Sequence, residues 1–127
     1  MKFSAKITGH GPDAFAFLGD PSTNFIIIFN DDAPDALAEL CVLHEEAELK
    51  EDVAVGDTIK FGPQEFVVTA VGSEANATLR GLGHCTIDFK GGPEPERPGC
   101  IMIQAVDASK PVPTEEDLAE GIMIEIF

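Results

Sequence analysis

Hydrophobic and polar positions alternate along much of this chain with the two-residue period of a β-strand. Apolar side chains occupy every second position in residues 2–8, and the same alternation returns around Ile59 and Phe61 and in residues 84–89. Successive side chains of a strand point to opposite faces, so this period indicates strands with one buried face. Three strands are therefore predicted in these segments.

Five further strands are indicated, most of them by continuous apolar or β-branched runs. Residues 23–29 include five consecutive apolar side chains, which is typical of a strand buried on both faces. Residues 65–71 are rich in Val and Thr, which favour strands. The remaining strands are predicted at residues 41–49, 100–106 and 122–127.

Two short helices interrupt the strands. The first is predicted at residues 34–40, with Pro34 at its first position, where proline is favoured. The second is predicted through Leu82, with Ser73 as its N-cap and Gly83 as its left-handed stop. Residues 13–18 could form a helical turn or a loop. Irregular connections are expected at residues 91–99 and 107–121.

This pattern predicts a mainly β fold: a small β-barrel or sandwich-like single domain, residues 1–127, with two short helices. The chain has 127 residues, of which 44% are hydrophobic, so it can bury a real core. Its aromatic residues are nine Phe with no Trp or Tyr, which suits the filling of a core.

The charge excludes several classes of partner. The formal net charge of −15 would repel nucleic acid and anionic membrane surfaces. No apolar run is long enough to cross a membrane, so no membrane insertion is expected. The three cysteines form no CxxC motif and do not resemble a disulfide framework. We therefore expect a cytoplasmic protein with reduced thiols.

His44 is the principal candidate for chemistry. It ends the apolar run 40–43 and is followed directly by Glu45 and Glu46. A neutral imidazole nitrogen can act as a nucleophile or a metal ligand. In a strand that continues to residue 49, Glu46 would share a face with His44 and could orient its ring. The alternative is a partly buried strand histidine with a hydrogen-bond partner and no chemical role.

His84 and the cysteines offer weaker candidates. His84 follows the C-terminal end of the second helix, where it could cap that helix or support His44. Cys41 with His44, and His84 with Cys85, could in principle form a zinc site. Adjacent and three-apart residues of a strand face opposite ways, so each pair offers one ligand, and we expect no metal and no cofactor. No hydrolase elbow or phosphate-binding loop is present.

Several motifs, in order, resemble those of one family. They are Ala33-Pro34, Cys41-Val42-Leu43-His44, Glu48-Leu49-Lys50, Val68-Thr69-Ala70-Val71-Gly72 and Leu79-Arg80-Gly81-Leu82-Gly83-His84. Over nearly its whole length, the chain resembles the glucitol/sorbitol-specific enzyme IIA components of the bacterial phosphoenolpyruvate-dependent sugar phosphotransferase system. It departs from many relatives at Glu46 and Ala47, where they have His and Gly, and at Thr78, where Asn is expected.

The resemblance implies a phosphotransferase component, a histidine phosphocarrier. His44 would accept a phosphoryl group from the phosphocarrier protein HPr and pass it to a cysteine on the IIB domain of a membrane transporter. Such a role calls for one exposed ring nitrogen, with the other held by a hydrogen bond. Two alternatives remain: a non-catalytic β-barrel interaction module and a metal-binding protein. The apolar strand 122–127 could also pair between chains and form a homodimer.

Overall fold

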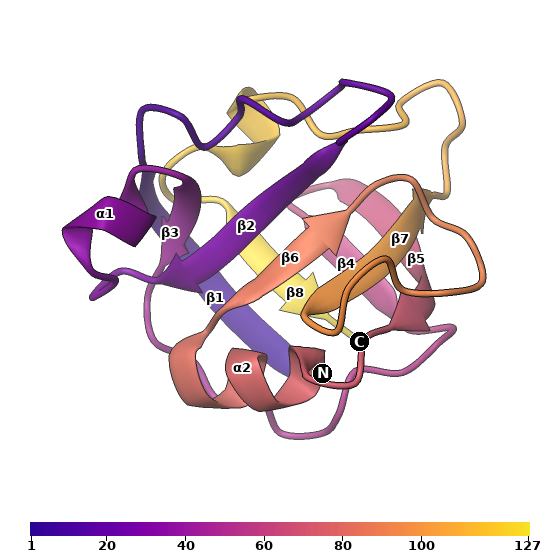
Figure 1. Cartoon of the computed structure of the whole chain (residues 1–127), viewed down its shortest axis with the longest axis horizontal. Helices are drawn as coiled ribbons and strands as arrows, with labels where there is room; N and C mark the ends of the chain where they lie inside the picture. Colours follow the sequence, from indigo (N-terminus) through magenta and orange to yellow (C-terminus); the bar gives the residue numbers. More distant parts are fainter.

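Eight strands close into a barrel in the computed structural model, which describes residues 1–127 (Figure 1). Around the barrel their order is β1-β3-β2-β6-β7-β5-β4-β8, so every strand has two hydrogen-bonded neighbours. The strands are β1 (Phe3–His10), β2 (Phe25–Asn30), β3 (Cys41–His44), β4 (Thr58–Phe61), β5 (Gln64–Val71), β6 (Cys85–Asp88), β7 (Cys100–Ala105) and β8 (Met123–Ile126). The mainly β, barrel-type fold expected from the sequence is confirmed.

In two pairs of adjacent strands the strands run parallel, and in all other adjacent pairs they run antiparallel. The parallel pairs are β2 with β3 and β6 with β7. Parallel neighbours need a crossover connection, and the one between β2 and β3 contains helix α1 (Asp35–Ala38). Helix α2 (Ala75–Leu82) joins β5 to β6 and contacts both β6 and β2. It lies across one end of the barrel, at the bottom of Figure 1.

The third strand is shorter than the sequence pattern indicated. We expected it at residues 41–49, but β3 ends at His44, and residues 45–50 have no regular structure. Its parallel partner β2 ends at Asn30, which pairs with His44, and the chain then turns at Asp31. Beyond His44 the strand therefore has no neighbour on that side to continue the ladder.

Both helices are also shorter than expected. Pro34 is the N-cap of α1 and not its first helical residue. Helix α2 begins at Ala75 and is capped by Glu74, so Ser73 is not its N-cap. The reason is a tertiary contact: the N–H of Gly72 donates to Cys100, the first residue of β7, and the N–H of Glu74 donates to Pro98 just before that strand, which fixes this turn. The left-handed stop at Gly83 is confirmed by its φ of 63°.

The last strand and the irregular connections can also be compared with the predictions from the sequence. Strand β8 pairs with both β1 and β4, so the free edge expected at residues 122–127 for a homodimer does not exist. Residues 12–19 form consecutive turns, and Phe15 packs against the core. The connection after β7 is irregular except for a short 3₁₀ helix, Glu116–Leu118. None of the helices has the length and apolar character needed to cross a membrane.

The main core is a cluster of 23 buried residues, to which all eight strands, α2 and several connecting segments contribute. At its centre three phenylalanine rings contact one another. The ring centroids of Phe61 and Phe66 are 5.8 Å apart, and those of Phe66 and Phe89 are 5.3 Å apart, with edge-to-face geometry in both pairs. Such pairs add to the free energy gained by burying their area.

One carboxyl group is buried at the end of β6. The Asp88 side chain is 1% exposed, and its Oδ1 accepts a hydrogen bond of 2.9 Å from the backbone N–H of Lys90. Burial raises the pKa of the Asp88 carboxyl, and the N–H and ammonium groups of Lys90 offset part of that rise. The charged form of Asp88 therefore opposes folding.

Replacing Phe66 by Ala should lower the free energy of unfolding by about 3–5 kcal/mol, because it empties a site at the centre of the core. Phe127→Ala is the matched control, since Phe127 is 44% exposed. It should cost less than about 1 kcal/mol. Urea denaturation of both variants measures these values, and equal losses would contradict the described core.

Asp88→Asn should stabilise the protein near neutral pH. When the pKa of a carboxyl is higher in the folded chain than in the unfolded chain, its contribution to the stability of the fold is lost as pH rises through the folded-state pKa. The Asn variant should therefore be more stable than wild type at about pH 7, and the gain should vanish at about pH 3, below the ordinary Asp pKa. Thermal melts across this range test it; a pH-independent difference would contradict the assignment.

Candidate functional site

His44 is the last residue of β3, and its side chain is fully buried, with 0% exposure. On one side its backbone pairs with Ile7 of β1, and on the other with Asn30 of β2. The imidazole contacts the ring of Phe3 edge-to-face, with centroids 5.7 Å apart. The histidine is thus held on all sides by the closed barrel.

Both ring nitrogens of His44 contact backbone carbonyls. Nδ1 lies 2.8 Å from the oxygen of Glu45, and Nε2 lies 2.8 Å from the oxygen of Gly83. A carbonyl only accepts hydrogen bonds, and a neutral imidazole has one N–H. The two contacts are therefore satisfied together only by a doubly protonated ring. In a neutral ring, one nitrogen lone pair would face a carbonyl oxygen.

Gly83 reaches His44 because of the way helix α2 ends. The N–H of Gly83 donates to the carbonyl of Leu79, which is the 5→1 bond of a helix terminus with a left-handed residue, and the N–H of His84 donates to Thr78. A Cβ atom at residue 83 would lie 2.0 Å from Asn30 Oδ1 and 2.7 Å from His44 Cε1. Glycine is therefore needed both for the positive φ and for the close approach.

Asn30 completes a cluster that the sequence analysis did not identify. It is the register partner of His44, is 9% exposed, and its Oδ1 has no hydrogen-bond partner. No hydrogen bond is formed by any other atom of its amide. The sequence did contain a signal for Asn30, because it is the single polar residue that ends the apolar run 25–29, directly before Asp31. We refer to His44, Asn30 and Gly83 together as the His44 cluster.

The other two predicted site residues lie beside this cluster without bonding to the His44 ring. His84 is half-buried, packs against the ring of Phe29 at 4.8 Å and has Nδ1 3.3 Å from the carbonyl of Ile28. Glu46 is exposed and lies past the end of β3, so the shared strand face that was to let it orient the ring does not exist. Two backbone carbonyls orient the ring in its place.

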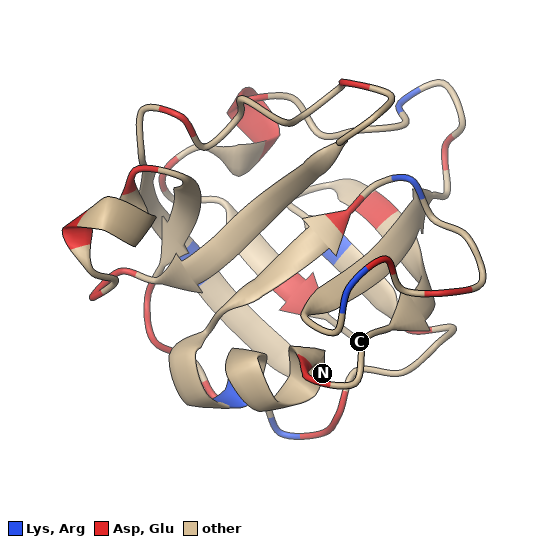
Figure 2. Ribbon diagram, in the orientation of Figure 1, with Lys and Arg blue, Asp and Glu red and all other residues tan.

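No ion pair of the protein includes a member of the His44 cluster. The four ion pairs join Lys2 to Asp57, Arg80 to Asp52, and Lys90 to Asp88 and Glu96. Figure 2 shows acidic residues on many of the loops and on α1, with Lys and Arg in few places. A negative group on His44 would therefore need neutral hydrogen-bond donors or a partner for its stabilisation.

The cysteines are poorly suited to metal binding. All three are free and buried, and burial raises the pKa of the Cys41 thiol to about 11 and that of Cys85 further still. Zinc binds the thiolate, which these thiols do not form readily at neutral pH. No three or more His, Cys, Asp or Glu side chains lie close enough together to hold a metal ion. The geometry thus provides no site for the metal-binding alternative.

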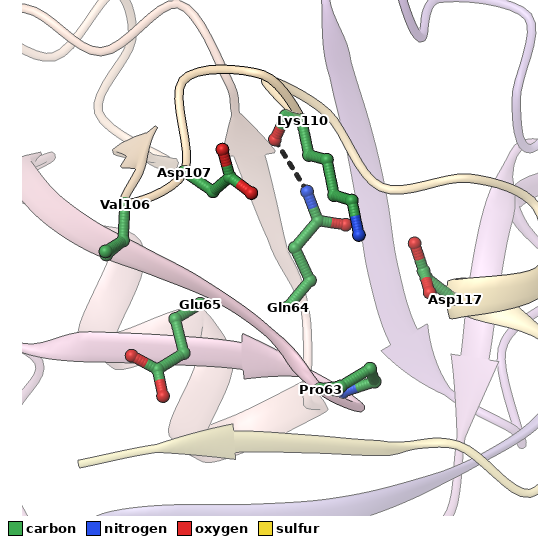
Figure 3. A pocket seen from close by; sticks show the side chains of 7 residues that line it. All are labelled: Pro63, Gln64, Glu65, Val106, Asp107, Lys110 and Asp117. Atoms are coloured by element: carbon green, nitrogen blue, oxygen red, sulfur yellow. Dashed lines mark hydrogen bonds between the residues drawn. The ribbon is translucent and has the colours of Figure 1, made fainter.

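A cavity of about 280 Å³ lies apart from the His44 cluster (Figure 3). It is lined by Pro63, Gln64, Glu65, Val106, Asp107, Lys110 and Asp117. Gln64 Nε2 donates a hydrogen bond of 2.7 Å to the backbone oxygen of Lys110, which ties the β4–β5 turn to the connection after β7. The lining contains no histidine or cysteine, so the buried imidazole remains the best candidate nucleophile.

Comparisons with known proteins agree on one family. Residues 2–120 match the family model described as the PTS system glucitol/sorbitol-specific IIA component, where PTS denotes the phosphotransferase system. The PTS system glucitol/sorbitol-specific EIIA component of Escherichia coli K12 is 36% identical over 123 residues, covering 97% of this chain and 92% of the relative. The protein of that name from Shigella flexneri matches equally well.

A solved structure has the same fold. The crystal structure of a PTS system IIA component from Enterococcus faecalis V583 superposes with a TM-score of 0.71 at 25% identity. The match covers 96% of this chain and 97% of that structure. Because both the family model and the relatives extend over nearly the whole sequence, this chain belongs to the family of PTS glucitol/sorbitol-specific IIA components.

Proposed function

We propose that this protein is a histidine phosphocarrier, which accepts a phosphoryl group on His44 from phosphorylated HPr and passes it to the IIB domain of a glucitol/sorbitol-type transporter. Membership in the IIA family supports a phosphotransferase role in general. The observation that carries the assignment to His44 is the ring geometry: of the three histidines, it alone has both ring nitrogens engaged by the backbone. A carrier needs one ring nitrogen held by a hydrogen bond, which the Nδ1 contact supplies. The exposed second nitrogen expected from the sequence is not present, because Nε2 contacts Gly83 and the ring is buried.

Nε2 is the nitrogen that would carry the phosphoryl group. Nδ1 bonds to the carbonyl of Glu45, the next residue in the chain, so this contact persists whenever the strand end is intact. An Nδ1–H that donates to a carbonyl leaves the lone pair on Nε2. That lone pair attacks phosphorus as the phosphorus–nitrogen bond of the donor's phosphohistidine breaks, and the electron pair returns to the donor ring. Positioning accounts for most of the catalysis of such a transfer.

Transfer requires the turn at Gly83 to withdraw. Its carbonyl oxygen lies 2.8 Å from Nε2, in the direction from which phosphorus must approach, and the ring is fully buried. This contact is favourable for a doubly protonated ring and unfavourable for a neutral ring with its lone pair on Nε2. The reactive form of His44 thus itself disfavours the closed turn.

The burial of His44 also favours one competing function. In a non-catalytic interaction module, His44 would be a structural residue that links β3 to the end of α2 through its two hydrogen bonds. The partner would then bind the outer surface, and no phosphoryl group would form. The two functions differ in whether a phosphoryl donor labels the protein, which the next experiment measures.

Incubation with phosphoenolpyruvate, enzyme I and HPr should add one acid-labile phosphoryl group to the wild-type protein, detected by intact mass. His44→Gln should take up none, because Gln keeps hydrogen-bonding groups in the buried site but has no nucleophilic nitrogen. His84→Gln is the matched control and should be labelled. Loss of label only in His84→Gln would move the site, and an unlabelled wild type with active donors would favour the interaction module.

Diethyl pyrocarbonate should modify His44 more slowly than the exposed His10, because the closed Gly83 turn covers Nε2. Gly83→Ala should accelerate modification of His44, since its Cβ would lie 2.0 Å from Asn30 Oδ1 and would push the turn away. Peptide mass spectrometry measures the rate at each histidine. Equal rates at His44 and His10 in the wild type would contradict the need for the turn to open.

A further inference from the structure

We propose that Asn30 is a phosphoryl-binding residue, whose side-chain amide donates a hydrogen bond to a phosphoryl oxygen on His44 once the Gly83 turn has withdrawn. The inference rests on the proposed phosphocarrier function and assigns a residue to hold the transferred group. It follows from the position of Asn30, from its lack of hydrogen bonds, and from the charge around His44.

The position of Asn30 is set by strand register. Asn30 and His44 are paired residues of the parallel strands β2 and β3, which places their side chains on one face, on strands about 4.8 Å apart. Both side chains are buried. A Cβ added to Gly83 would meet Asn30 Oδ1 and His44 Cε1 together, so the same turn covers both. Its withdrawal would open one space bounded by the amide and the ring.

The Asn30 amide has no structural partner. Its buried Oδ1 accepts no hydrogen bond, although buried polar atoms are nearly always paired. By contrast, the amide of Asn76 in α2 accepts from the N–H of Val53 at 2.7 Å and donates to its carbonyl at 3.1 Å. An apolar side chain would serve a strand end better than an unpaired amide. A role in the fold therefore does not account for Asn30. Oδ1 is an acceptor and faces the Gly83 turn, so it cannot pair with a phosphoryl oxygen. The amide would have to rotate to present its Nδ2–H donors, which no protein acceptor engages, to that oxygen.

The charge around His44 makes a neutral donor useful. A phosphoryl group brings about two negative charges to a protein of net charge −15. No ion pair and no cationic partner belongs to the His44 cluster. The N–H of an amide can stabilise a phosphoryl oxygen without a cation. A neutral donor also binds more weakly than Arg or Lys would, which suits a group that must be passed on.

The test compares Asn30→Val with wild type in phosphoryl transfer from phosphorylated HPr. The variant should fold with a thermal midpoint at or above that of wild type, because it removes an unpaired polar group and Val favours strands. Its transfer rate and its equilibrium yield of phosphohistidine should fall on the order of tenfold to a hundredfold, as expected for a lost hydrogen bond to a charged group.

Two further variants separate this role from a structural one. Asn30→Asp keeps the shape but places a carboxylate beside the phosphoryl group, so its yield should fall below that of Asn30→Val. Asn76→Ala is the matched control: it loses two hydrogen bonds and therefore stability, while transfer per folded molecule stays normal. The phosphorus NMR shift of the phosphohistidine should change in the Asn30 variants and stay constant in Asn76→Ala.

Wild-type rate, yield and phosphorus shift in Asn30→Val would overturn the assignment while leaving the phosphocarrier function intact. If Asn30→Val does not fold, Asn30→Asp decides, and wild-type transfer in that variant overturns the assignment equally. An unlabelled wild-type protein, or a His44→Gln variant that is still labelled, would overturn the proposed function itself, and the role of Asn30 with it.

Discussion

The parallel pairing of β2 with β3 is the constraint on which the rest of the site depends. Both strands end at one register position, with Asn30 opposite His44, and the chain leaves the barrel at both points. The paired strand ends bring the Asn30 amide and the His44 imidazole together among buried apolar side chains. The end of α2 then covers them, because the left-handed turn at Gly83 directs a carbonyl to Nε2. The pairing is possible because the crossover through α1 returns the chain beside β2.

Closure of the barrel determines which parts can move. Every strand has two hydrogen-bonded neighbours, so His44 and Asn30 lie on a scaffold that resists local opening. The Gly83 turn joins α2 to β6 and lies against Asn30 and His44, while the neighbouring His84 packs on Phe29 and contacts Ile28. In the proposed function, this turn withdraws from the imidazole while the barrel stays closed. The protonation state of the imidazole determines whether its contact with the turn is attractive or repulsive.

The sequence predicted those features that depend on local pattern. Alternation at residues 2–8 and the β-branched run at 65–71 produce strands, and Gly83 ends a helix, because each of these signals is contained in a short segment. Predictions from the sequence failed where a residue distant in the chain determines the end of a strand or the start of a helix. The end of β3 at His44 is set by β2, and the turn before α2 is fixed by the start of β7 and the residues just before it instead of by Ser73. His44 was chosen as the candidate from the sequence, but its burial and its pairing with Asn30 arise from strand register, which no local motif encodes.

A phosphoryl carrier must hold its group firmly enough to survive until the next encounter and loosely enough to release it. An arginine beside His44 would favour holding, whereas a fully solvated ring would favour loss to water. This site has neither: the ring is enclosed, the cluster includes no ion pair, and the available groups are backbone carbonyls and one unpaired amide. The net charge of the chain, like the composition of the site, would favour release of the phosphoryl group over its retention. In the proposed function, a net charge of −15 would disfavour retention of a further anion and would favour encounter with a partner whose reactive histidine has basic surroundings.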